Sequence, residues 1–221
     1  MPKDTFLNLP DEKRQAILDV AIDEFSSKDF NAVSITHLVD RAGIAKGSFY
    51  QYFEDKRDLY LYLMEITARE KEGFLRSNPP PDPAMGLFPY LRWLFNVGFQ
   101  FQLSNPRLAM VAYRALYTEM LFRDEVLFQF RSQVKDFYRQ LLEMGVRQGD
   151  IDPEIDLETA AFLLDNIFGE LGNYLVRQLG LSEETFRTMH FTETQQAEME
   201  RVYNQVIHIL ERGLAVKEKE K

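Results

Sequence analysis

The sequence predicts an all-α protein, and three observations carry that prediction. Apolar residues recur at spacings of three and four along nearly the whole chain of 221 residues. No alternating apolar and polar run bounded by turn residues is long enough to build a sheet. The composition, 45% hydrophobic and 28% charged, is that of a globular protein, and the absence of cysteine excludes disulfides, thiolate catalysis and cysteine zinc sites.

Helix start and stop signals predict four helices in the first third of the chain, at about 10–26, 35–42, 46–53 and 55–77. Pro10 suits the first position of the first helix. Ser34 can cap the start of the second helix, and Gly43 ends it. After Gly43, only Ile44 and Ala45 precede the third helix, so the second and third helices must cross steeply. Asp55 caps the fourth helix.

A proline-rich segment, residues 79–83, is the clearest boundary in the chain. Proline cannot continue a helix, and it pushes the residue before it out of the α region. Beyond this segment the same periodicity predicts helices at about 84–103, 106–119, 123–148, 156–179 and 195–214. Residues 149–153 and 180–194 are predicted to be loops, the second with room for one short helical turn.

The charge balance weighs against a nonspecific nucleic-acid binder. The formal charge is −9, and residues 1–58 hold 8 basic against 11 acidic residues. Because nonspecific affinity comes mainly from neutralised phosphates, any DNA contact must be small and focused. The N-terminus lacks an apolar signal core, and the most apolar stretch, residues 85–103, is interrupted by Arg92, Asn96 and Gln100. We therefore expect a cytoplasmic protein with no membrane contact.

Residues 34–56 carry the most informative pattern. Two short helices joined by a glycine-containing turn fit a helix-turn-helix, whose second helix enters the major groove of DNA. In that second helix Phe49 and Phe53 lie four apart and face the core. The residues left to face outward or to flank that face are Lys46, Ser48, Tyr50, Gln51 and Tyr52. Their polar groups can bind phosphates and read base edges. A close approach of backbone to phosphate would explain Gly47, which costs about 1 kcal/mol inside a helix.

The stretch Gly43-Ile44-Ala45-Lys46-Gly47-Ser48-Phe49-Tyr50-Gln51-Tyr52-Phe53, followed by Lys56 and Leu59, resembles the helix-turn-helix signature of the TetR family of bacterial transcriptional regulators. The resemblance covers about residues 10–60. It implies a three-helix DNA-binding domain over 1–58 and a helical effector-binding and dimerisation domain over 59–221. It also implies which residues meet DNA: Lys46, Gly47, Ser48, Tyr50, Gln51 and Tyr52 in the second helix, and Lys56, helped by Ser34 or Thr36, at a phosphate. Ala45 departs from the small hydroxyl residue often found at its position.

Several of these residues also have a purely structural alternative. Tyr50 and Tyr52 can be half-buried packing aromatics. Ser34 can be an N-cap and nothing more. Lys56 can be a solvated lysine, but a cation at a helix start opposes the helix dipole by about 0.3 to 1 kcal/mol, so a phosphate partner explains it better.

Helices after residue 84 are rich in aromatic residues, most of which must fill the core. Large rings also suit an apolar cavity, which the TetR resemblance implies here. The candidate lining residues are Trp93, Phe99, Tyr113 and Phe168. A polar stripe of Asn166, Glu170 and Asn173 can line that pocket, an interface or solvent.

The last predicted helix has the clearest apolar stripe, which includes Val202, Val206 and Leu210. In a TetR-like arrangement this helix pairs with the helix at 156–179, where Gly169 and Gly172 allow close approach, and two subunits form a four-helix interface. The alternative is burial within one subunit.

Enzyme patterns are missing. The histidines His37, His190 and His208 are scattered and form no metal pair or catalytic dyad. We expect no enzymatic activity, no cofactor and no metal. The sequence favours a homodimeric repressor that binds an inverted-repeat operator in double-stranded DNA and is released by a small apolar or aromatic effector. The alternative is a helical ligand-binding or interaction protein without DNA binding.

Overall fold

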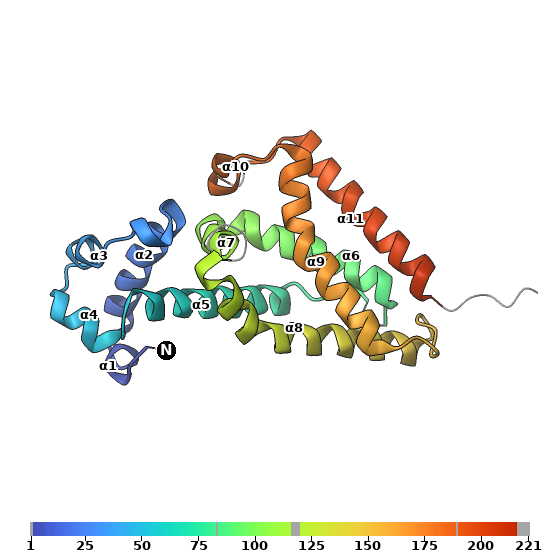
Figure 1. Ribbon diagram of the computed structural model, residues 1–221, viewed down its shortest axis with the longest axis horizontal. Coiled ribbons are helices and arrows are strands. Elements are labelled where there is room, and N and C mark those ends of the chain that lie inside the picture. Colours follow the sequence, from blue (N-terminus) through green and yellow to red (C-terminus); the bar gives the residue numbers. More distant parts are fainter. Residues whose placement is uncertain (1, 83, 116–119, 189, 216–221) are drawn as a thin grey trace, which may run out of the picture. The chain divides into compact units, whose positions relative to one another are not determined.

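The computed structural model describes residues 2–82, 84–115, 120–188 and 190–215, with the backbone alone for 120–133, 183 and 186–187. Its elements in chain order are α1 (Asp4–Leu7), α2 (Asp11–Ser27), η1 (Phe30–Ala32), α3 (Ile35–Arg41), α4 (Lys46–Tyr52), α5 (Lys56–Ser77), α6 (Leu87–Ser104), α7 (Pro106–Tyr113), α8 (Met120–Gln148), α9 (Leu157–Leu179), α10 (Glu183–Thr188) and α11 (Glu193–Leu214) (Figure 1). Within these ranges the only β-type pairing is an isolated bridge between Ile151 and Ala215. The all-α prediction is confirmed.

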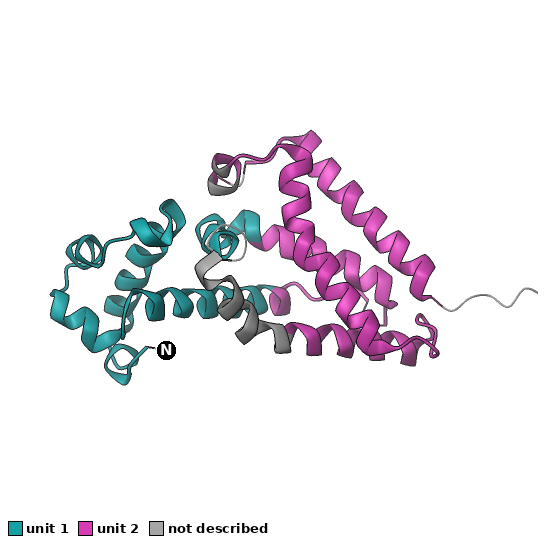
Figure 2. Cartoon of the chain, in the orientation of Figure 1, with its two compact units in different colours: residues 1–74, 102–126 teal, residues 75–101, 127–221 magenta. Residues whose placement is uncertain are grey.

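The chain forms two compact units (Figure 2). Unit 1 comprises Met1–Phe74 and Gln102–Val126, and unit 2 comprises Leu75–Phe101 and Leu127–Lys221. The expected domain boundary, between residues 58 and 59, lies inside α5, and unit 1 continues to Phe74. Contacts of Tyr60 on α5 join this part of the helix to unit 1. Tyr60 is fully buried beside the rings of Phe25 and Phe30, and its hydroxyl donates to the carbonyl of Val111 on α7 at 3.4 Å.

Unit 1 is built around large buried aromatics. Phe25 of α2, Phe49 of α4 and Tyr60 of α5 are almost fully buried, and Phe6 of α1 and Phe53 after α4 join the same interior. Their rings meet at centroid distances such as 4.7 Å for Phe6 and Phe53 and 4.9 Å for Phe25 and Tyr60. Packing against this interior holds one side of α4 in place, and the other side of the helix lies outside the core.

Unit 2 has its core between α6, α8, α9 and α11. The buried members are Leu87, Phe88, Leu91, Leu141, Leu142, Ile151, Ala160, Ala161, Leu164, Tyr203, Ile207 and Leu210. The Tyr203 hydroxyl donates to the carbonyl of Leu91 at 2.8 Å, so its buried polar end is satisfied. The Asp150 carboxylate accepts a hydrogen bond from the backbone N–H of Leu87 at 2.7 Å, next to Gly86.

The predicted helix boundaries agree with the structure to within a few residues, with three differences. The helix α1 and the short helix η1 were not expected, and α10 lies where a single turn was allowed. The helix expected over 106–119 is α7, which ends at Tyr113, and residues 116–119 lie outside the described ranges. In the described part of the chain, no helix combines the length and apolar character needed to cross a membrane.

Candidate DNA-binding surface

The turn between α3 and α4 has the geometry that the sequence predicted. Ser34 caps α3, since its side chain accepts from the backbone N–H of His37. Gly43 has φ of +63°, a conformation that glycine adopts at no steric cost. The N–H of Gly43 bonds to Asp40 and the N–H of Ile44 bonds to Val39, which is the double hydrogen bond of a Schellman motif. The chain therefore ends α3 sharply at Arg41 and begins α4 at Lys46, after a turn of four residues.

One side of α4 is buried and the other is exposed. Phe49 faces the core, whereas Lys46, Gly47, Tyr50 and Gln51 are exposed and Ser48 is half-exposed. The start of α4 has no side-chain cap, because Ala45 occupies the N-cap position. Across the turn, the Lys46 ammonium lies 3.5 Å from the Thr36 hydroxyl, to which it donates. The structure thus gathers most of the expected DNA-contacting residues on one accessible surface.

Tyr52 does not belong to the exposed side. Its side chain is 7% exposed, and its ring packs 5.8 Å from that of Phe6. The packing partner comes from α1, which the sequence analysis did not predict. The purely structural alternative for Tyr52 therefore fits the structure, and little of its ring is left for DNA.

Lys56 is held by the protein itself. Its ammonium donates to the carbonyls of Phe30 and Val33 at 2.6 and 2.8 Å and lies 4.4 Å from the centre of the Phe30 ring. These contacts tie the start of α5 to the segment around η1. They explain why a cation is tolerated at this helix start without a phosphate partner.

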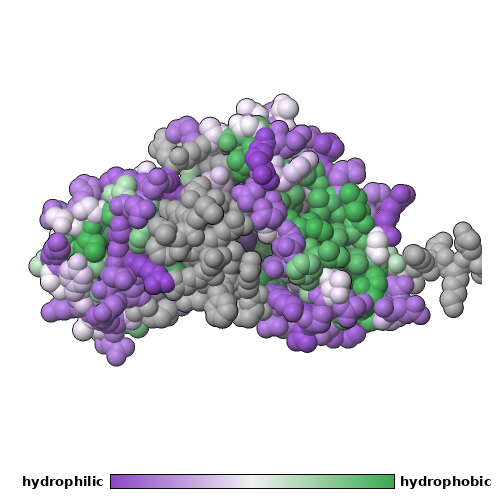
Figure 3. Space-filling model, in the orientation of Figure 1, coloured by the Kyte–Doolittle hydropathy of each residue, from purple (hydrophilic) through white to green (hydrophobic). Residues whose placement is uncertain are grey.

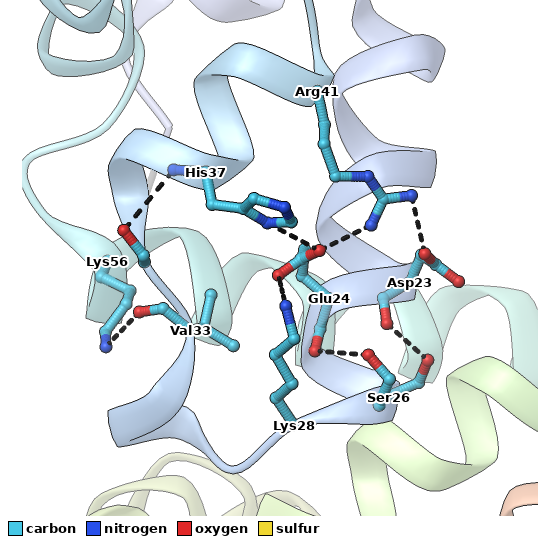
Figure 4. A network of polar contacts seen from close by, with 10 residues as sticks. Asp23, Glu24, Ser26, Lys28, Val33, His37, Arg41 and Lys56 are labelled. Atoms are coloured by element: carbon cyan, nitrogen blue, oxygen red, sulfur yellow. Dashed lines mark hydrogen bonds and ion pairs between the residues drawn. The ribbon is translucent and has the colours of Figure 1, made fainter.

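A buried carboxylate joins α2 to α3 (Figure 4). Glu24 is 1% exposed, and its oxygens accept from Lys28 at 2.7 Å and Arg41 at 2.6 Å and lie 3.1 Å from Nδ1 of His37. Arg41 also pairs with Asp23 at 2.8 Å. Burial by itself would raise the pKa of the Glu24 carboxyl, but the hydrogen bonds from Lys28, Arg41 and His37 outweigh it and lower the pKa to about 2. Glu24 is therefore ionised and fixes the orientation of α3 on α2.

Lys3 and Thr5, at the start of α1, form contacts with the end of α4 that the sequence did not predict. The backbone N–H of Lys3 donates to the Tyr52 carbonyl at 2.8 Å, its ammonium donates to the Tyr50 carbonyl at 3.0 Å, and the Thr5 hydroxyl donates to the Gln51 carbonyl. A four-residue helix is too short for periodicity to reveal it. The one available signal was Phe6, an aromatic residue preceding Pro10.

The expected effector residues do not gather in one cluster. Phe168 packs beside Tyr138 and Tyr203, and Phe99 packs beside Phe95 and Phe191 in a neighbouring cluster. Trp93 lies 5.0 Å from the ring of Tyr90. These three residues belong to unit 2, whereas Tyr113 belongs to unit 1.

The expected interface residues divide in a similar way. Val202 and Leu210 are buried in two hydrophobic clusters of the single chain, and Val206 packs against the cluster that contains Leu210. Little of this stripe is therefore accessible to a second copy. Gly169 is exposed and Gly172 half-exposed on α9. Apolar side chains that the sequence analysis did not single out are more accessible: Phe162 (59% exposed), Leu163 and Tyr174 on α9, and Ile209 (68%) on α11. Figure 3 shows a hydrophobic area over the part of unit 2 that contains these two helices.

The polar stripe on α9 is on the accessible side. Asn166 and Glu170 are exposed and Asn173 is half-exposed. The Asn166 amide donates to the Phe162 carbonyl at 2.7 Å, and the Asn173 amide donates to Glu170 at 3.1 Å. These local bonds favour a solvent or interface position over a pocket-lining one.

Comparison with known proteins identifies the family. The profile described as "Bacterial regulatory proteins, tetR family" matches residues 17–63, and "Tetracyclin repressor-like, C-terminal domain" matches residues 85–215. The chain belongs to the TetR family. A TetR family transcriptional regulator from Chloroflexus aurantiacus is 46% identical, with 98% of this chain and 100% of that chain covered and a TM-score of 0.71.

Two other similar proteins are more distant in sequence. The probable acrEF/envCD operon repressor of Escherichia coli K12 is 26% identical over 176 residues, which is 76% of this chain and 78% of that protein. The regulator FadR from Bacillus subtilis, solved in complex with stearoyl-CoA, is 16% identical with a TM-score of 0.65, over 90% of this chain and 98% of that chain. The likeness to FadR shows the fold alone. The likeness to the E. coli repressor, together with the family match, supports a TetR transcriptional regulator with a DNA-binding helix-turn-helix.

Proposed function

We propose that this TetR protein represses transcription by placing α4 in the major groove of an inverted-repeat operator. The observation that carries the proposal is the one-sided exposure of α4 directly after the Schellman turn. Phe49 anchors the helix from the core, while Tyr50 and Gln51 are presented outward. A glutamine amide can donate to and accept from the edge of an adenine, and a tyrosine hydroxyl can bind a phosphate.

Gly47 adds a second argument for a close partner. A Cβ built at Gly47 would meet no atom within 4 Å among the described residues, so the protein's own packing does not require glycine there. Glycine inside a helix nevertheless costs about 1 kcal/mol relative to alanine. Close approach of a DNA backbone to the exposed first turn of α4 would explain why a side chain is absent.

Operator binding by the purified protein tests this function. The duplex is the one that the unmodified protein selects from a random-sequence pool. We expect Gln51→Ala to change the preferred base at one position in each half-site, with a loss of about 1 to 3 kcal/mol at that position. Lys13→Ala, an exposed substitution on α2, is the matched control and should keep the preference. If the unmodified protein selects no sequence, the helical ligand-binding alternative is favoured instead.

The proposed dimer surface consists of Phe162, Leu163 and Tyr174 on α9, Ile209 on α11, and the accessible glycines Gly169 and Gly172. Exposed large apolar residues concentrated on two helices are typical of an interaction surface. In a two-fold dimer the same surface is used by both copies, which would present two α4 helices to one duplex.

The proposed effector has a sizeable apolar body and binds among the aromatic residues of unit 2. Support comes from the rings around Phe95, Phe99, Phe168 and Tyr203, and from the stearoyl-CoA complex of the B. subtilis regulator, which shares this fold. Trp93 is the only tryptophan, so its fluorescence reports binding in unit 2. Titration with acyl-CoA of increasing chain length should quench it at progressively lower concentration, whereas free coenzyme A should not. Equal response to coenzyme A and acyl-CoA would contradict an apolar effector site.

A further inference from the structure

The last turn of α4 is capped by a segment that lies far away in the sequence. The carbonyls of Tyr50, Gln51 and Tyr52 each accept a hydrogen bond from Lys3 or Thr5. The final carbonyls of any helix lack partners within that helix. Phe53, which follows α4, has an extended backbone, so α4 does not end in the left-handed cap that closes many helices. The donors from Lys3 and Thr5 therefore replace a local cap.

The capping segment is itself firmly anchored. Phe6 is fully buried, and its ring lies 4.7 Å from Phe53 and 5.9 Å from Tyr62. At the other end of α1, the Arg14 guanidinium on α2 donates to the Leu7 carbonyl at 2.8 Å. Lys3 pairs with Glu54 at 3.0 Å. These contacts hold the donor groups of Lys3 and Thr5 in a fixed position beside α4.

A short helix depends strongly on such a cap. The seven residues of α4 are too few for an independently stable helix, and Gly47 weakens it further. The side chains proposed to read DNA, Tyr50 and Gln51, belong to the same turn as the capped carbonyls. When only a fraction of molecules holds the binding-competent conformation, the apparent affinity falls by that fraction.

We propose that residues 3–6 are a positioning element for DNA recognition, which holds the last turn of α4 in its binding conformation through the Lys3 and Thr5 hydrogen bonds. The proposal rests on the proposed function of α4. It concerns residues outside the family profile, which begins at residue 17.

The decisive variant is Thr5→Val, which removes the donor, keeps the shape and changes no charge. Thr5 is exposed, so little core packing is disturbed. The loss of one neutral hydrogen bond predicts a decrease in operator affinity of up to about fivefold. Without DNA, hydrogen exchange of the α4 backbone amides should accelerate about fivefold, while exchange in α2 stays unchanged. Thr5→Ser keeps the hydroxyl and should restore both values.

Salt dependence separates positioning from direct phosphate contact at Lys3. Lys3→Ala should weaken operator binding and leave the slope of log affinity against log salt unchanged. Lys13→Ala, which removes the same charge from an exposed position on α2, should change neither affinity nor slope. If Lys3→Ala reduces the slope by about one phosphate contact, Lys3 binds DNA directly and its positioning role is overturned.

The two proposals can fail separately. If the unmodified protein binds no duplex, the proposed function fails, but the exchange rates of α4 without DNA still test the cap. If the protein binds its operator and Thr5→Val changes neither the affinity nor the exchange of α4, the positioning role of residues 3–6 is overturned.

Discussion

Nη1 of Arg41, the last residue of α3, donates to Oε1 of the buried Glu24 carboxylate on α2 at 2.6 Å. This bond joins the first helix of the helix-turn-helix to the helix beneath it. Lys28 and Arg41 compensate the charge of Glu24. Because both cations are partly exposed, only the carboxylate is fully desolvated, and its ion pairs offset that cost. The orientation of α3, and with it the turn into α4, thus depends on one ionised carboxylate.

The first prediction concerns stability at acid pH. The pKa of Glu24 falls from 4.5 to about 2 on folding. A lowered folded pKa contributes stability that is fully present above about pH 4.5 and is lost as the pH falls towards 2, with a magnitude on the order of 3 kcal/mol. Glu24→Gln should therefore lower the free energy of unfolding by about that amount at pH 7 and by much less at pH 2. Urea unfolding followed by circular dichroism across this range measures the difference.

The control for this prediction is Glu198→Gln on α11. Glu198 pairs with Arg201 at 2.6 Å, but the pair is on the surface, where screening leaves ion pairs little net effect. Its substitution should change stability little at any pH. A Glu24→Gln protein whose stability follows that of the unmodified protein in parallel from pH 7 to pH 2 would contradict the assigned role of Glu24.

The second prediction sets stability against DNA affinity at Gly47. Gly47→Ala should stabilise α4 by up to about 1 kcal/mol, because alanine is the better helix former and the added Cβ meets no described atom. The same methyl group should obstruct the close approach of DNA and reduce operator affinity by about tenfold or more. Gly73→Ala on α5, where an added Cβ also meets nothing within 4 Å, should give a comparable gain in stability and unchanged affinity. Thermal melting and operator titration of both variants measure the two effects, and unchanged affinity in Gly47→Ala would remove the second argument for α4.

The third prediction concerns the core of unit 2. A Cβ at Gly145 on α8 would lie 2.7 Å from Cγ1 of Ile151 and 2.9 Å from Cδ2 of Leu87, both of which are buried. Overpacking of this kind costs about 1 to 3 kcal/mol, which exceeds the gain in helix propensity. Gly145→Ala should therefore lower the melting temperature, whereas Gly73→Ala should not. A rise in both variants would show that the α6 and α8 contact can expand without cost.

Much of the fold could be predicted because its signals are local. Ser34 and Asp156 cap α3 and α9 as expected, and Gly43 ends α3 in the predicted turn. The helix α1 could not be predicted, since its value lies in bonds to α4 that span about 46 residues of sequence. The burial of Tyr52 depends on the same unseen partner, Phe6.

The apolar stripe of α11 shows a second limit of sequence analysis. Periodicity shows that one face is buried, but not whether the partner is the same chain or another. In the structure Val202 and Leu210 face their own subunit's core, and the side chains left for a partner, such as Ile209, lie beside the stripe. The candidate interface therefore had to come from exposure, which only the folded chain provides.

The last prediction tests that interface. In a two-fold dimer every substitution occurs twice, so Phe162→Glu combined with Ile209→Glu would bury four unpaired carboxylates per dimer. The dimer dissociation constant should rise by about a hundredfold or more, and sedimentation equilibrium should show monomers at concentrations where the unmodified protein is dimeric. Because both side chains are exposed in the single chain, helicity and melting of the monomer should be retained. Leu103→Glu replaces a different exposed apolar residue, on α6, and should leave the dimer intact. Operator affinity should fall with dimerisation, since a monomer presents a single α4. If the double variant stays dimeric, the copies associate through another surface, and the apolar area on α9 and α11 serves a different partner.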